Sequence, residues 1–216
     1  MKLQWLGHSA FRLADESGTS IITDPFDPYI GYAMPRLSCD AAVCSHGHSD
    51  HHYTAGVDGS PMVIDTVGTH NVRGVRINGV LSNHDPNGGT KRGKNIIYSF
   101  DFCGLTVCHM GDIGEACTQA LVKKLPPVQI LLIPVGGNYT IDAKEAKAYV
   151  DAIKPNVVIP MHYQMENKSF AVSTVDPFLA LFHTASVTRA ETETLEFTAS
   201  ALPASTQIIV AKRCKG

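Results

Sequence analysis

Four histidines and one aspartate fall within residues 46–52, which read His-Gly-His-Ser-Asp-His-His, although the whole chain of 216 residues contains only ten histidines. A packed core does not explain this run, because every buried imidazole needs a polar partner. An exposed loop gains nothing from histidine at this density. Neutral imidazole and carboxylate are, however, the side chains that bind Zn²⁺, Mn²⁺, Fe²⁺ and Ni²⁺. The segment therefore predicts a metal centre.

Three further ligand-type residues, His84, Asp112 and His162, each lie just past a short apolar run of the kind expected for a buried strand. Taken alone, each reads equally well as an ordinary residue at the start of a loop. In layered α/β folds, however, strand ends meet at one rim, and binding sites form there. One loop cannot complete two coordination spheres, so we expect these three residues to join the cluster at residues 46–52.

Hydrophobic patterning predicts many short strands and three helices. Strands are expected at residues 2–6, 10–14, 19–23, 41–45, 62–65, 75–81, 95–100, 105–109, 130–134, 157–160, 195–198 and 207–210. Helices are expected at residues 113–125, 143–153 and 175–184. No linker separates the strand-rich first half from the alternating second half, so residues 1–216 are expected to form a single domain. Two mixed sheets flanked by helices accommodate this order.

Residues 46–51 have the form H-x-H-x-D-H, and His84, Asp112 and His162 follow in order. This arrangement resembles the metallo-β-lactamase superfamily. Shorter stretches resemble compact metal-dependent hydrolases related to ascorbate-6-phosphate lactonase: residues 7–10, 23–25, 110–112, 136–140 and 159–163. The resemblance implies a four-layer α/β fold, an αββα sandwich of two mixed β-sheets with metals at one edge.

The same resemblance implies a complete set of ligands for two divalent ions. The implied ligands are His46, His48 and His84 for the first ion, Asp50, His51 and His162 for the second, and Asp112 as a bridge between them. Zn²⁺ is the first choice of metal, with Mn²⁺, Fe²⁺ and Ni²⁺ as alternatives.

Five other residues are expected near the site. Asp24 follows an apolar run and is expected to accept a proton from a ligand histidine, which fixes the tautomer of that histidine. His8 is read as a turn histidine, with a place at the edge of the cleft as the alternative. Arg92, in the basic loop 88–94, is a candidate to supply positive charge to an anionic substrate, with a solvated basic turn as the alternative. Asn138 and Tyr163 are candidates for hydrogen bonds to the substrate, or else packed loop residues.

These features predict a hydrolase in which a hydroxide held by two metal ions attacks a small ester, lactone or phosphodiester, with Asp50 and Asp112 as its catalytic carboxylates. Asp50 would orient the nucleophile. Two alternatives stay open: a metal- or ligand-binding protein without activity, and a di-iron redox protein. Relatives of the redox type usually carry glutamate where this chain has His48, and they add a flavin domain.

Composition narrows the partners and the compartment. The net charge is −2 and no broad basic segment occurs, which argues against nucleic acid as a partner and favours a small molecule. The basic loop 88–94 would suit an anionic one. No apolar stretch approaches the roughly 20 residues that span a bilayer. The six cysteines form no regular framework and the N-terminus has no secretory pattern, so we expect reduced thiols and a cytoplasmic protein. The sequence leaves the oligomeric state open.

Overall fold

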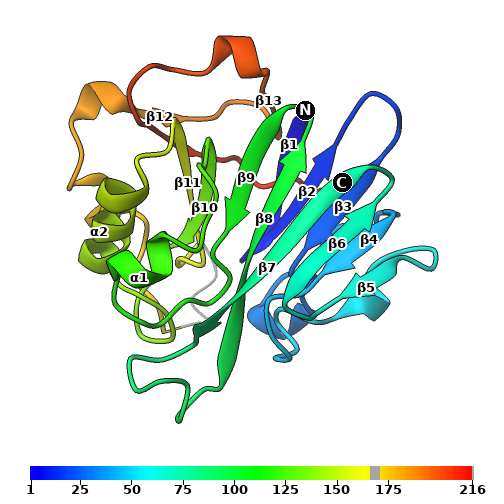
Figure 1. Cartoon of the computed structure of the whole chain (residues 1–216), viewed down its shortest axis with the longest axis horizontal. Helices are drawn as coiled ribbons and strands as arrows, with labels where there is room; N and C mark the ends of the chain where they lie inside the picture. The colour runs from blue at the N-terminus through cyan, green and yellow to red at the C-terminus, as the bar shows by residue number, and fades with distance from the viewer. Residues whose placement is uncertain (166–170, 216) are drawn as a thin grey trace.

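The computed structural model describes residues 1–165 and 171–215. Two β-sheets face each other (Figure 1). The first sheet has six strands in the order β13-β1-β2-β3-β4-β5. Its strands are β1 (Lys2–Gly7), β2 (Ala10–Ala14), β3 (Ser20–Thr23), β4 (Ala41–Val43), β5 (Met62–Ile64) and β13 (Thr194–Glu196). Pairing is antiparallel from β13 to β3 and parallel from β3 to β5, so the sheet is mixed.

The second sheet has eight strands in the order β12-β14-β11-β10-β9-β8-β7-β6. Its strands are β6 (Gly68–Val72), β7 (Val75–Asn83), β8 (Lys94–Phe102), β9 (Leu105–His109), β10 (Ile130–Pro134), β11 (Val157–Met161), β12 (Val187–Arg189) and β14 (Gln207–Val210). The β6–β9 part is antiparallel and the remainder is parallel. Both edge strands, β6 and β12, escaped prediction, because one is mostly polar and exposed and the other has only three residues.

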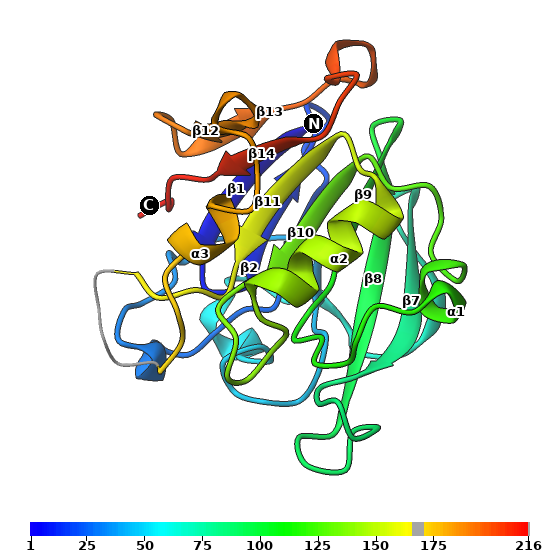
Figure 2. The same cartoon turned by 90° about the vertical axis from the view of Figure 1, so that its left-hand side faces the viewer.

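Apolar side chains from both sheets meet between them and form the largest core, which includes Trp5, Phe11, Tyr98, Phe100 and Ile159. A second core lies between the outer face of the eight-stranded sheet and the helices, which lie over it in Figure 2. The outer face of the six-stranded sheet is covered differently. The loop after β3 folds back onto it and buries Phe26, Ile30 and Met34. The predicted sandwich is confirmed, with a loop as the cover of one face.

The helix α2 (Ala143–Ile153) begins where the sequence predicts. Asp142 accepts hydrogen bonds from the first turn, and the Glu145 side chain bonds back to the Asp142 backbone, which completes a capping box. Its apolar face packs Ala146, Tyr149 and Val150 onto the second sheet. Among residues 1–165 and 171–215, no helix is long and apolar enough to cross a membrane.

The predicted helix at residues 113–125 is wrong over most of its length, because α1 covers only Gln119–Val122. The backbone of residues 113–115 is engaged elsewhere: Gly114 N donates to Asn83 O, and Ile113 O accepts from Ile141 N. The Glu115 carboxylate also accepts two hydrogen bonds from Asn83. These long-range bonds replace the i→i−4 ladder that a helix would need.

The helix predicted at residues 175–184 is also shorter than expected, since α3 covers only Asp176–Leu179. Beyond it, Leu181 N and Phe182 N bond to carbonyls three residues earlier, so the chain continues as tighter 3₁₀-type turns to Phe182. His183 is then extended, with ψ 134°. The predicted apolar packing survives, because Phe178 is fully buried against the second sheet.

Candidate metal centre

Strand directions bring the predicted ligands together. In the second sheet β7 runs parallel to β9, β10 and β11, and in the first sheet β1 runs in the same direction as β3 and β4. One site residue closely follows each of six strands: His8 follows β1, Asp24 follows β3, His46 follows β4, His84 follows β7, Asp112 follows β9 and His162 follows β11. The site therefore forms where the C-terminal ends of strands from both sheets meet, and it brings His84, Asp112 and His162 to the cluster at residues 46–52 as their positions predict.

Asp112 lies at the centre of the cluster. Its Oδ2 is 3.2 Å from His51 Nε2 and 3.4 Å from the Nε2 atoms of both His84 and His162. All four side chains are almost completely buried. One carboxylate oxygen thus faces imidazoles from both predicted ligand groups, which is the position that a bridging ligand would occupy.

The first ligand group converges from two loops. His46 Nε2 lies 2.9 Å from His48 Nδ1, and the ring of His84 is 4.7 Å from that of His46 between centroids. Two nitrogens bound to one tetrahedral zinc ion are roughly 3.3 Å apart, given Zn–N bonds of about 2.0–2.1 Å. Burial, followed by the neighbouring His51, lowers the pKa of His46 to about 3, so its imidazole is neutral at pH 7. A neutral ring leaves a lone pair for a metal ion.

Asp24 orients two of the predicted ligand histidines, His51 directly and His46 through Ser45. Its Oδ2 accepts a hydrogen bond from His51 Nδ1 at 2.8 Å and another from the Ser45 hydroxyl at 2.7 Å. The Ser45 oxygen is in turn 3.0 Å from His46 Nδ1. A carboxylate can only accept, so His51 carries a proton on Nδ1. The Ser45 hydroxyl gives its hydrogen to Asp24 and therefore accepts from His46 Nδ1, which directs the Nε2 lone pair of His46 into the cluster. His51 Nε2 would offer a lone pair there once it is deprotonated to bind metal. The sequence pattern predicts no role for Ser45, although this residue directly precedes the histidine run.

The charges of the buried groups balance one another. Burial alone would raise the pKa of Asp112, but His162 and His51 hold it well below its usual range. Burial alone would lower the pKa of His51, but Asp112 and Asp24 raise it well above its usual range. A divalent ion would replace the His51 proton as the positive charge here, since imidazole must be deprotonated to bind metal.

The loop that carries Asp112 is tightly constrained. Asn95 accepts a hydrogen bond from Asp112 N and donates to Ser82 Oγ and to Met110 O. Gly111 has φ +56°, and a Cβ there would lie 2.2 Å from Asn95 Oδ1. Only glycine fits both the backbone conformation and this close approach. Neither residue is recognisable from sequence pattern, because their contacts link separate strands.

Three non-glycine residues with positive φ lie at the same place. His8, Asp24 and His162 have φ values of 50°, 40° and 51°, which lie in the left-handed region. Such conformations are uncommon outside glycine and persist where the surrounding structure fixes them. All three directly follow strands that end at the site. These conformations are therefore associated with turning these side chains inward.

A cavity of about 290 Å³ opens onto the cluster. Its lining residues are His48, Asp50, His84, Arg92, Asp112, Tyr139 and His162. Arg92 is the cationic side chain among them. Its guanidinium lies 4.9 Å from the centroid of the Tyr139 ring, and it donates a hydrogen bond to Asn138 O. The volume is close to the lower end for ligand sites, about 300 Å³, and suits a small molecule.

Two of the candidate substrate residues have other contacts. The Asn138 side chain donates to Ala171 O, while its carbonyl supports Arg92. Tyr163 packs against the inter-sheet core, with its ring 5.3 Å from that of Trp5. Lys94, in the same basic loop as Arg92, donates to Asn83 Oδ1 and Gly88 O. Arg92 and Tyr139 are thus the parts of these loops that reach the cavity.

The donor set fits divalent metal ions. Histidine and aspartate side chains within 4.8 Å of one another form three overlapping groups: His8, Asp50, His51 and His162; His46, His48 and His84; and His46, His51 and Asp112. Among the described residues, the buried ligand-type atoms without a hydrogen-bond partner include His51 Nε2, His84 Nδ1 and Asp112 Oδ1. Unpaired buried polar atoms are costly, and metal ligation would satisfy His51 Nε2 and Asp112 Oδ1.

Comparison with known proteins agrees with this geometry. A family model described as the β-lactamase superfamily domain matches residues 2–162. The chain therefore belongs to the metallo-β-lactamase superfamily. Its relatives include a UPF0173 metal-dependent hydrolase of Carboxydothermus hydrogenoformans, which is 31% identical over 192 residues that cover 76% of this chain and 84% of that protein.

A second UPF0173 metal-dependent hydrolase, from Methanosarcina mazei, is 30% identical over 207 residues, or 82% of this chain and 87% of that protein. A crystal structure from Thermotoga maritima, assigned as a Zn-dependent hydrolase of the metallo-β-lactamase superfamily, is 38% identical, with a TM-score of 0.81. The alignment covers 99% of both chains. The fold and the family are thus shared over the full length of that protein.

Proposed function

We propose that this protein is a hydrolase that uses two divalent metal ions to cleave a small ester, lactone or phosphodiester. The observation that carries the proposal is the position of Asp112, whose Oδ2 lies 3.2–3.4 Å from one histidine of the first ligand group and two of the second. The names of the relatives, metal-dependent and Zn-dependent hydrolases, support the same reaction class.

The proposed division of the ligands follows the one that the family resemblance implies. His46, His48 and His84 would hold one ion, Asp50, His51 and His162 the other, and Asp112 would face both. When bound, two such ions supply Lewis-acid polarisation of the substrate and lower the pKa of a water molecule toward 7. Zn²⁺ suits this mixture of imidazole and carboxylate, and Mn²⁺, Fe²⁺ and Ni²⁺ are the alternatives.

The protein side chains would orient the reacting groups. Asp50 is half-buried, lines the cavity, and has its Oδ2 3.3 Å from His8 Nε2. This contact fixes the carboxylate that would position the attacking nucleophile. Asp24 would keep His51 and His46 in the ligating tautomer through the bonds described above. Such outer partners typically change metal affinity or activity by roughly 10–100-fold.

Arg92 would bind an anionic group of the substrate away from the scissile bond. The guanidinium is anchored from behind by Asn138 O and by the face of Tyr139, so it keeps donors for a phosphate or carboxylate. The metal ions would neutralise only the reacting group, so a distal anion needs its own cation. A lactone with a phosphate away from its ring ester, as the resemblance to the lactonase implies, satisfies this requirement.

The decisive experiment measures hydrolysis and metal content together. Protein reconstituted with Zn²⁺ or Mn²⁺ would be tested on esters, lactones and phosphodiesters, each in a neutral and an anionic version. We expect turnover that chelation abolishes and metal restores. His51→Ala should remove activity, whereas His52→Ala should keep it, because His52 is partly exposed and contacts Asp65.

Other outcomes identify the alternatives. Full metal loading without turnover on any substrate class would indicate a binding protein that lacks activity. Two iron ions per chain with reversible redox behaviour would indicate a di-iron redox protein. Absence of metal after reconstitution near pH 7.5 would refute every metal-based function.

A further inference from the structure

His8 is held firmly in the turn between β1 and β2. Its carbonyl accepts hydrogen bonds from Trp5 Nε1 at 3.0 Å and from His162 N at 3.2 Å, and its own N–H donates to Tyr32 Oη at 2.9 Å. The residue is 7% exposed and has φ 50°. A histidine that serves only as a turn residue would not need to be buried and held by these three hydrogen bonds. The hydrogen bond from His162 N to His8 O thus joins this turn of the first sheet directly to the His162 loop of the second.

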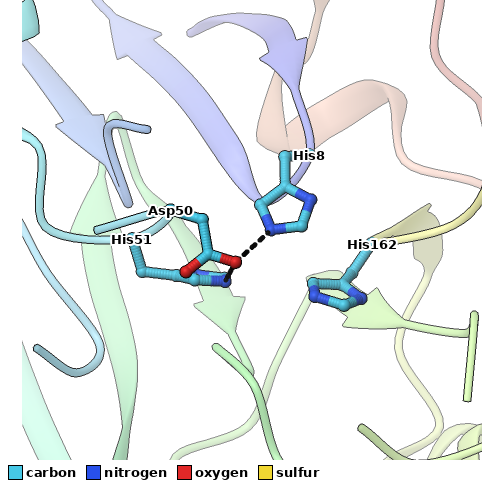
Figure 3. A group of neighbouring side chains, drawn as sticks. All are labelled: His8, Asp50, His51 and His162. Atoms are coloured by element: carbon cyan, nitrogen blue, oxygen red, sulfur yellow. Dashed lines mark hydrogen bonds and ion pairs between the residues drawn. The ribbon is translucent and has the colours of Figure 1, made fainter. Parts of the chain in front are cut away.

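The constraints direct the His8 ring into the cluster, as Figure 3 shows. The Nε2 atom lies 3.3 Å from Asp50 Oδ2. The ring centroid is 4.3 Å from that of His162 and 4.9 Å from that of His51. One ligand atom from each of these four side chains lies within 4.8 Å of the other three. A single ion can therefore be surrounded by all four.

The number of donors distinguishes the two metal positions. His46, His48 and His84 offer three donors on one side of Asp112. On the other side His8 raises the number from three to four. Asp112 would add one donor to each side, so the second ion would have the larger number of protein ligands and the less room for water or substrate. Residues of both groups line the cavity, but His48 of the first group is the exposed one, so the more open position belongs to the first group.

We propose that His8 is an additional protein ligand of the ion bound by Asp50, His51 and His162. This ion is then the more fully ligated and more tightly held one, and the ion at His46, His48 and His84 is the one that meets the substrate. The inference rests on the two-ion arrangement of the proposed function. His8 reaches the ion from the side of Tyr32 and Tyr163, with which it lines a separate small cavity of about 20 Å³.

The competing explanation is that His8 only donates a hydrogen bond to Asp50 and thereby orients it. Two substitutions separate the roles. His8→Asn removes the ring but tolerates a positive φ, so the turn is preserved. His8→Gln places an amide donor near the position of Nε2, so a hydrogen bond to Asp50 survives while the imidazole ligand is lost. His52→Gln is the matched control, since it removes a histidine next to the predicted ligand His51 that lies outside all the donor groups.

The test is a titration of metal-free protein with Zn²⁺ against a competing chelator, repeated with Co²⁺ to record the visible spectrum. Wild-type protein should bind one ion much more tightly than the other. Both His8 variants should weaken the tight site by more than the roughly 100-fold that outer partners cost, and should change the Co²⁺ spectrum of that site. His52→Gln should match wild type. Circular dichroism of the metal-free proteins would verify that all variants fold.

Recovery of tight binding and of the wild-type spectrum in His8→Gln would overturn the inference, as would a loss of less than 100-fold in both variants. The metal readout also separates this inference from the proposed function. If wild-type protein binds two ions but hydrolyses nothing, the function fails and His8 as a ligand is still testable. If hydrolysis occurs and both His8 variants keep the tight ion, only the ligand assignment fails.

Discussion

The candidate metal cluster and the loop that carries Arg92 border the same cavity, but they are held in different ways. In the cluster most of the side chains are buried, and Asp24 and Asn95 form hydrogen bonds that fix predicted ligand residues. In residues 85–94 most side chains are exposed. That loop is organised from inside by Asp85, whose carboxylate accepts four backbone N–H bonds from residues 87, 89, 91 and 92.

The difference follows from what each region has to recognise. Coordination of a metal ion requires donors to be held within about 0.5 Å, so their rotamers must be locked by packing and hydrogen bonds. A cation that meets a distal anion needs only to be near, and a loop on a rigid support suffices. Changes in the cluster should therefore affect metal binding, while changes in the loop should affect substrate binding alone.

The largest effect is expected for Asp112→Ala. Removal of the carboxylate that faces both ligand groups should reduce bound metal to one ion or none and lower activity by more than roughly 100-fold, beyond the range of outer partners. Elemental analysis and hydrolysis assays would measure both. Asp101→Ala is the control, because Asp101 is exposed and paired with Arg76. Retention of two ions by Asp112→Ala would show that this carboxylate is not a bridge.

Asp24→Asn should have an intermediate effect, a loss of metal affinity of roughly 10–100-fold. The amide can still accept a hydrogen bond through its oxygen, but its NH₂ group cannot accept from Ser45 N or Ser45 Oγ as the carboxylate does. Chelator competition would measure the change. An unaffected affinity would mean that packing alone orients His51 and His46, and the contrast between cluster and loop would weaken.

The sequence predicted the cluster well because its chemistry is local. Four of the seven predicted ligands lie within residues 46–51, and His84, Asp112 and His162 lie past strands whose apolar patterns are easy to read. The strands themselves were mostly predicted, since periodicity reports burial. Assignment of each ligand to an ion stays a prediction.

Features that depend on contacts between distant segments could not be predicted. The position of His8 beside His162 requires knowledge that β1 and β11 end at the same edge of two facing sheets. The pattern of residues 113–125 is helical in isolation, but hydrogen bonds to residues 83 and 141 take up its backbone. Arg92 was singled out for its charge, whereas its support by Tyr139 became visible only in the structure.

Arg92→Ala should separate the two regions most clearly. We expect KM for anionic substrates to rise by roughly 10-fold, the value of one charge-assisted hydrogen bond of about 1.5 kcal/mol, with KM for neutral substrates and metal content unchanged. Steady-state kinetics on paired anionic and neutral substrates would measure this. Lys94→Ala is the control within the same loop, since Lys94 bonds to Asn83 and Gly88. Equal effects on both substrate types would assign Arg92 to loop structure alone.

The smallest effect is expected for Asp85→Asn, and it depends on pH. Burial would raise the pKa of Asp85, but the backbone N–H groups of Arg92, Lys91, Asn87 and Gly89 lower it to about 2. The unfolded value is about 3.9. Because the folded pKa is the lower one, the charged carboxylate stabilises the protein above about pH 4, and this contribution disappears as the pH falls toward 2.

The measurement is urea unfolding of metal-free wild type and Asp85→Asn between pH 7 and pH 3. Wild type should be the more stable protein by a constant margin above about pH 5, and the margin should shrink at lower pH. KM for anionic substrates at pH 7 should rise only a few-fold, less than in Arg92→Ala, because Asn138 and Tyr139 still hold the guanidinium. A margin that stays constant down to pH 3 would mean that the loop is held by its own turns, and that Asp85 adds no charge-dependent support.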